Sequence, residues 1–184
     1  MKDVTYLLPC RIETEDRLRN VIASITYIMK CFPEAKVIVK EVDTQSHFNE
    51  SALPRIKSYV GDTSQLKHIF EQSSEKFFHK TRILNDLCIA ADTPILYNHD
   101  VDVVVLKNSH ELAHRAITKE GSDAVYPFGC GIYQWAVTYS DQLLDKFLSS
   151  HDGNDADFEV LKDAKVRIPS VSYTHLTLPT KRSV

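Results

Sequence analysis

Cysteine is scarce and widely spaced in this sequence of 184 residues. The sequence has no Cys-x-x-Cys pair, the arrangement that supplies ligands to many structural zinc sites. The wide spacing of the cysteines is also unlike that of a disulfide framework. We therefore expect reduced, buried thiols. The four positions are Cys10, Cys31, Cys88 and Cys130.

Long apolar runs and an excess of one charge are also missing. The opening residues, MKDVTYLLPC, hold only a short apolar run, and no later segment reaches the roughly 18 apolar residues of a membrane-spanning helix. The net charge of -3 comes from 22 basic and 25 acidic residues that are spread along the chain, without a basic cluster for nucleic acid. We expect a cytoplasmic protein with no membrane span and no nucleic-acid partner.

The sequence does contain an alternation of strand-like and helix-like segments. Residues 35–42 are rich in β-branched side chains, whereas 15–31 carry apolar residues at helical spacing. The expected strands are 4–8, 35–42, 66–71, 94–98, 124–126 and 132–139, and the expected helices are 15–31, 81–91, 109–118, 140–149 and 155–164. This order predicts a single α/β domain. No element is assigned to residues 43–64.

The last fourteen residues, VSYTHLTLPTKRSV, break this alternation. They resemble a translated sequencing-adapter tail of the kind found at the ends of reading frames from environmental assemblies. We therefore expect one domain over residues 1–170, incomplete at its C-terminus, followed by a non-native tail over 171–184.

Residues 94–105, PILYNHDVDVVV, place Asp100 and Asp102 between two apolar runs. Buried carboxylates need a counter-charge, water or a metal. At the carboxyl end of a strand, acids at i and i+2 point to one side and can share a hard divalent cation. An exposed turn with solvated carboxylates explains the same residues, and the short motif alone does not decide. By strand alternation, the neighbouring His99 faces either the site or the opposite side.

A family resemblance comes from residues 78–102, FHKTRILNDLCIAADTPILYNHDVD. They are similar to the stretch of GT-A glycosyltransferases, especially β-1,4-galactosyltransferase-like and family 2-like enzymes, in which F-N-R and L-N precede a helix, a strand and D-V-D. The matching positions are Phe78, Lys80, Leu84, Asn85, Asp100 and Asp102. Lysine stands at position 80 where that family has arginine, so a point charge replaces a planar fork.

Two further segments resemble the same family. Residues 7–18, LLPCRIETEDRL, match its first-strand loop P-F-R-x-R at Pro9 and Arg11, but Glu13 stands in place of a second arginine. Residues 151–161, HDGNDADFEVL, resemble its G-G-E-D-D-D segment and depart from it at positions 154 and 156. The matching positions there are Gly153, Asp155 and Asp157. The resemblance covers about residues 4–168.

The resemblance implies a GT-A fold, a Rossmann-like α/β domain with a mixed central sheet flanked by helices. It implies an Mn²⁺ or Mg²⁺ ion, bound directly by Asp102 and assisted by Asp100 through water or the ribose. Asp155 would be the general base that takes the acceptor's proton, with inversion at the anomeric carbon. The implied donor-binding residues are Pro9, Arg11, Glu41, Phe78, Lys80, Asn85 and Asp100. The implied partners are a nucleotide sugar, with a UDP-sugar as the expected donor, and a glycan or other hydroxyl acceptor. In the galactosyltransferases a further metal ligand follows the acid segment, in the part that is missing or replaced here.

Three alternatives stay open. Residues 110–114, HELAH, form H-E-x-x-H, in which His110 and His114 would bind zinc and Glu111 would act as the base of a hydrolase. The extended ligand pattern is absent, and a solvated amphipathic helix capped by Ser109 explains the same residues without zinc. Asp155 is also suited to be a helix N-cap. The third alternative is a domain that binds a nucleotide or sugar without turnover.

Overall fold

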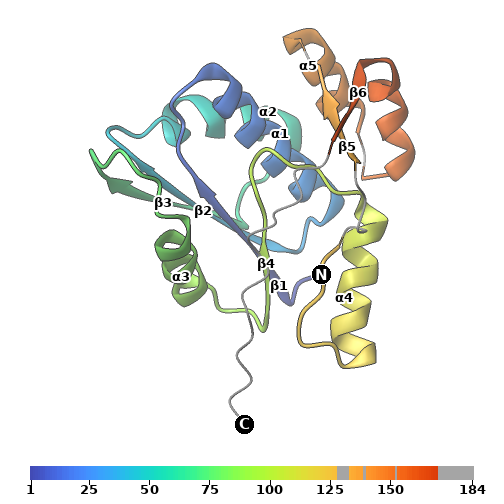
Figure 1. Cartoon of the computed structure of the whole chain (residues 1–184), viewed down its shortest axis with the longest axis horizontal. Coiled ribbons are helices and arrows are strands. Elements are labelled where there is room, and N and C mark those ends of the chain that lie inside the picture. The colour runs from blue at the N-terminus through green and yellow to red at the C-terminus, as the bar shows by residue number, and fades with distance from the viewer. Residues whose placement is uncertain (128–132, 139, 152, 170–184) are drawn as a thin grey trace.

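The computed structural model describes residues 1–127, 133–138, 140–151 and 153–169, with the backbone alone described at 133–135, 155–157 and 167–169 (Figure 1). The elements are β1 (Val4–Cys10), α1 (Glu15–Cys31), β2 (Lys36–Asp43), the π-helix η1 (Phe48–Ala52), α2 (Leu53–Val60), β3 (Leu66–Gln72), α3 (Lys80–Ala90), β4 (Ile95–Asn98), α4 (Lys107–Glu120), β5 (Tyr133–Val137), α5 (Asp141–Ser150), the 3-10 helix η2 (Asp155–Ala164) and β6 (Lys165–Pro169). None of the helices in these ranges is both long enough and apolar enough to cross a membrane.

Four parallel strands form the main sheet in the order β3-β2-β1-β4. The predicted α/β class is confirmed, but the predicted mixed sheet is wrong for the described strands, because each neighbouring pair in this sheet runs parallel. The chain adds β2 and β3 on one side of β1 and then returns past β1 to add β4. Since crossover connections are right-handed, this reversal sends α1 and α2 to one face of the sheet and α3 to the other (Figure 1).

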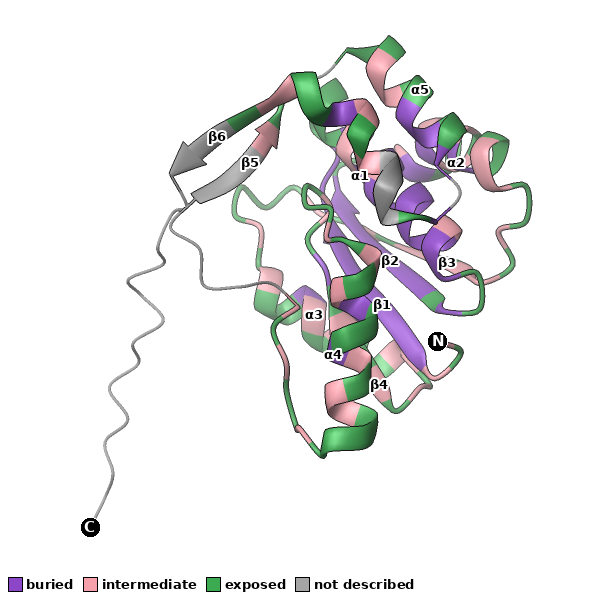
Figure 2. Cartoon of the chain, turned by 90° about the vertical axis from the view of Figure 1, so that its right-hand side faces the viewer, coloured by how far each residue is buried: buried purple, intermediate pink, exposed green. Residues whose placement is uncertain are grey.

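The core forms where the most apolar segments meet. Strands β1 and β2 lie between other strands and are buried along almost their whole length, as Figure 2 shows. Helix α1 packs its apolar side on the Tyr6 and Leu8 side of β1. Its start is fixed by Thr14, whose hydroxyl accepts the N–H of Arg17 at 3.3 Å, so one orphan donor of the first turn is satisfied.

A second group of elements packs on α1 through aromatic rings. Tyr27 of α1 lies 6.4 Å from the ring of Phe147 in α5 and 5.5 Å from that of Phe158 in η2, between ring centroids. Residues 155–164 were predicted as a helix, and the structure has a 3-10 helix there. Strands β5 and β6 form a separate antiparallel pair.

Three other expectations are corrected. Residues 124–126 form no strand, because an apolar triplet becomes a strand only where a neighbouring strand supplies its hydrogen bonds, and here Tyr126 is exposed. Residues 43–64, left unassigned, contain η1 and α2. Cys10 and Cys31 are buried free thiols as predicted, but Cys88 is exposed. Cys130 lies outside the described residues.

Candidate functional site

The carboxyl ends of β1 and β4 lie side by side where the strand order reverses. Leu7 pairs with Asn98, and the N–H of His99 extends this ladder to the carbonyl oxygen of Leu7 at 3.1 Å. The connections from two such strands leave toward opposite faces of the sheet and open a crevice at its edge. Arg11 directly follows β1 and Asp100 follows β4, so the fold brings both residues to this edge.

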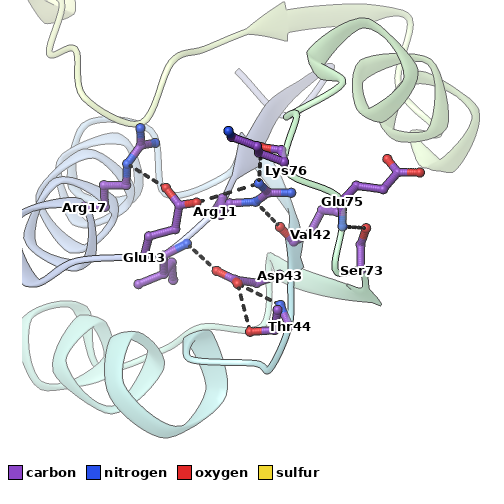
Figure 3. Close-up of polar contacts among 10 residues, drawn as sticks. Arg11, Glu13, Arg17, Val42, Asp43, Thr44, Ser73, Glu75 and Lys76 are labelled. Atoms are coloured by element: carbon purple, nitrogen blue, oxygen red, sulfur yellow. Dashed lines mark hydrogen bonds and ion pairs between the residues drawn. The ribbon is translucent and has the colours of Figure 1, made fainter.

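Arg11 is held by backbone carbonyl groups and an aromatic ring. The side chain is 8% exposed; its Nε donates to the carbonyl oxygen of Val42 at 2.9 Å and its Nη1 to that of Lys76 at 3.3 Å (Figure 3). The guanidinium carbon lies 5.6 Å from the centroid of the Phe78 ring, within reach of a cation–π interaction. Glu13, half exposed, approaches Nη1 at 3.7 Å. A buried cation with neutral acceptors and one loosely placed carboxylate favours an anionic ligand.

Asp43 ties the ends of β1 and β2 together beside Arg11, and sequence reasoning missed it. Its carboxylate accepts the N–H of Ile12 at 3.1 Å and that of Thr44 at 2.7 Å, and the side chain is 7% exposed (Figure 3). The available signal was its position: Asp43 ends the second strand at the same sheet edge at which Arg11 follows the first.

Glu41, expected at the donor site, is fully buried and uses its carboxylate inside the protein. The oxygens accept from Ser46 Oγ at 2.7 Å and from the N–H of His47 at 2.8 Å, and His68 Nε2 lies 3.0 Å away. Burial opposes ionisation, but these hydrogen bonds outweigh it and hold the pKa of Glu41 below its ordinary value. Glu41 therefore anchors the loop that follows β2. Pro9 is also buried, within β1.

The two aspartates lie in a turn beyond β4, which ends at Asn98. The N–H of Val103 donates to the carbonyl oxygen of Asp100 at 3.3 Å and closes this turn. The alternation of side chains along a strand, which predicted that both acids share one side, therefore does not apply to them. Both are exposed. The ammonium group of Lys80, in the first turn of α3, forms an ion pair with the Asp100 carboxylate.

An open hollow of about 590 Å³ lies at the start of α3, beside this ion pair. It is lined by Glu75, Phe78, His79, Lys80, Thr81 and Arg82. Aromatic and cationic side chains, together with the Glu75 carboxylate, thus line one side of a space large enough for part of a nucleotide. Asn85 is on the exposed side of α3. A second hollow, of about 450 Å³, lies beside Arg19 and Asp141 and contains none of the predicted site residues.

Residues 151–161, the segment that resembles the acid segment of the family, pack on the C-terminal end of α1. Lys30 donates from Nζ to the carbonyl oxygen of His151 at 2.8 Å, and the N–H of Gly153 lies 2.7 Å from His151 Nδ1. Gly153 has φ +92°, and a Cβ there would lie 3.0 Å from the carbonyl oxygen of Lys30, so this match to the family pattern has a local structural reason. Asp155 begins η2. Its side chain, and that of Asp157, lie outside the described part of the chain.

The histidines of HELAH have separate structural partners. His110 is fully buried, with Nδ1 3.2 Å from the hydroxyl of Tyr6, and His114 Nε2 lies 2.9 Å from the carboxylate of Asp3. In the described ranges, no three His, Cys, Asp or Glu side chains are grouped as metal ligands. The alternative of a zinc hydrolase thus gains no support from this geometry.

The turn of Asp100 and Asp102 fits a hard divalent cation by the chemistry of its donors. Mg²⁺ commonly takes one or two carboxylates, keeps several waters and fills its remaining positions with substrate phosphate oxygens. Two exposed carboxylates, one of them paired with Lys80, are donors of the kind that such a site would need. No family model and no curated protein matches the sequence.

Proposed function

We propose that this chain is a GT-A-type glycosyltransferase domain that uses Mn²⁺ or Mg²⁺ to move a sugar from a nucleotide sugar to an acceptor hydroxyl. The proposal rests on two contacts near the carboxyl ends of β1 and β4, where the strand order reverses (the switch point). Arg11 makes a cation–π contact with Phe78, and Lys80 forms an ion pair with Asp100. A nucleoside diphosphate offers an aromatic base and two phosphates. This edge of the sheet offers an aromatic ring, two cationic side chains and two carboxylates.

The proposed roles follow the charges of the side chains. Asp102 and Asp100 would hold the cation, and Arg11 and Lys80 would bind phosphate oxygens of the donor. When bound, the ion supplies Lewis-acid stabilisation of the negative charge that develops on the diphosphate leaving group. UDP is the expected nucleotide, on the family resemblance described above.

Asp155 is the proposed general base. Its carboxylate would take the proton of the acceptor hydroxyl while the oxygen bonds to the anomeric carbon and the bond to the diphosphate breaks. Attack opposite the leaving group inverts that carbon. This assignment rests on the resemblance of residues 151–161 to the acid segment of the family, whereas the contacts described for this segment are with the C-terminal end of α1.

A panel of nucleoside diphosphates in a thermal-shift assay, with and without Mn²⁺, tests the proposal. A ligand at about 100 times its Kd stabilises the folded form by about 2.7 kcal/mol, which is about 5–10 °C in Tm for a domain of this size. We expect this shift for UDP only when Mn²⁺ is present, and its loss in Asp102→Asn. Asp123→Asn, at an exposed aspartate after α4, is the matched control and should keep the shift.

Release of UDP from UDP-sugars then separates transfer from binding. Mn²⁺-dependent release that disappears in Asp102→Asn supports the transferase. Metal-dependent binding without any release favours the domain that binds without turnover. If no nucleoside diphosphate changes Tm in the presence of Mn²⁺, the proposed donor site is refuted.

A further inference from the structure

His99 lies beneath the turn of Asp100 and Asp102, and the core fixes it from several sides. The side chain is 3% exposed, and its ring centroid lies 6.1 Å from that of Tyr6 in β1 and 5.9 Å from that of His110 in α4. Its backbone N–H belongs to the β1–β4 ladder. The ring of His99 therefore lies in the protein interior, directly against the backbone of the turn that carries the two aspartates.

The hydrogen bonds of His99 lead from the core to the turn, and their directions follow from chemistry. His99 Nδ1 lies 2.8 Å from the carbonyl oxygen of Asp100, and because a carbonyl only accepts, Nδ1 carries the proton. Ser24 Oγ of α1 lies 3.4 Å from this Nδ1 and 3.5 Å from the carbonyl oxygen of Val103. The Ser24 hydroxyl thus donates to the carbonyl oxygen of Val103, and its oxygen can accept from the N–H at His99 Nδ1. Both ends of the turn 100–103 are tied to buried groups.

We propose that His99 and Ser24 are positioning residues, which fix the backbone of the turn and thereby hold the carboxylates of Asp100 and Asp102 in place for a divalent cation. The inference rests on the proposed function. Both side chains are exposed, so the backbone beneath them sets the direction in which each leaves the chain, and the ion pair with Lys80 also holds the Asp100 carboxylate. A lost anchor would let the turn sample other conformations, and bringing the two oxygens to one ion would then cost additional free energy.

Two substitutions at position 99 separate the hydrogen bond from the packing. His99→Phe keeps an aromatic ring against Tyr6 and His110 but has no donor. His99→Asn loses much of the ring but places an N–H near the former Nδ1. We expect His99→Phe to weaken Mn²⁺ binding in the presence of UDP by about 10–100-fold, measured by EPR titration, and His99→Asn to stay within about threefold of the wild type. Ser24→Ala should fall between them.

Amide hydrogen exchange at Val103, in the metal-free protein well below its Tm, gives a readout that does not require ligand. His99→Phe should exchange faster there, and His99→Asn should match the wild type. Equal Mn²⁺ affinity in all three proteins, or an equal loss in both variants, overturns the positioning role. If the wild type binds no Mn²⁺ with UDP, the proposed function has failed; the exchange rates then decide the positioning alone, and unchanged rates refute it.

Discussion

Glu71 of β3 forms ion pairs with β2 and with α3, the helix that begins at the candidate site. Its Oε2 lies 2.7 Å from Lys40 Nζ of β2, and its Oε1 lies 2.7 Å from Arg82 Nη2 of α3. Lys40 is 8% exposed and also meets Asp86 of α3 at 2.5 Å. Because α3 presents Lys80 to Asp100, this network links the stability of the fold to the geometry of the site. We predict that Glu71→Gln lowers stability in a strongly pH-dependent way.

The size of the effect follows from the pKa of Glu71. The hydrogen bonds from Arg82 and Lys40 lower this pKa from its ordinary 4.5 to about 2. A shift of that size would be about 3 kcal/mol if fully realised. Glu71 is 31% exposed and Arg82 is 45% exposed, so solvent screens the pairs, and we expect about 1–2 kcal/mol.

The pH dependence has a definite sign. A carboxyl group whose pKa is lower in the folded state stabilises the protein fully above its unfolded pKa, and the contribution is lost as the pH falls from 4.5 toward 2. At about pH 3.5, between the two pKa values, a large part of it should have disappeared. Urea unfolding at about pH 7, and then at decreasing pH, measures the gap between wild type and Glu71→Gln. Glu111→Gln, an exposed glutamate on α4, is the control. A gap at neutral pH that does not shrink in acid would refute the reasoning.

Two further predictions concern the site directly. Gly153→Ala should destabilise the protein by about 2 kcal/mol or more in urea unfolding, because its Cβ would meet the carbonyl oxygen of Lys30 at 3.0 Å and its φ is positive. Gly121→Ala, with φ +73° and open space around the new Cβ, should cost only about 1 kcal/mol, and an equal cost for both would exclude the close contact as the cause. Lys80→Met should bind Mn²⁺ alone more tightly, by about threefold to tenfold in EPR titration, because the Asp100 carboxylate loses its counter-charge, while its UDP affinity falls. Unchanged Mn²⁺ affinity in Lys80→Met would contradict a role of the ion pair in blocking the metal.

The fold was predictable where local sequence and tertiary packing agree. Helix α1 begins and ends at its predicted residues because the Thr14 cap, the acidic first turn and the apolar spacing all favour the same helix. Residues 124–126 and the mixed sheet were not predictable, because the pairing of a strand depends on partners far away in the sequence. A side chain's surroundings were the least predictable feature: Glu41 appeared suited to bind a ligand, yet the loop at Ser46 and His47 occupies its carboxylate.

The charges at the switch point imply an exchange of partners under the proposed function. In the ligand-free protein, the ammonium group of Lys80 already neutralises Asp100, so a divalent cation must compete with it for the carboxylate. A nucleoside diphosphate removes this competition, because its phosphates offer Lys80 another anion while they contribute oxygens to the metal. Arg11 depends less on such an exchange, since its hydrogen bonds go to backbone carbonyl groups and the half-exposed Glu13 carboxylate lies 3.7 Å from its Nη1. Metal and donor should therefore bind with positive coupling, and by linkage each raises the affinity of the other by the same factor.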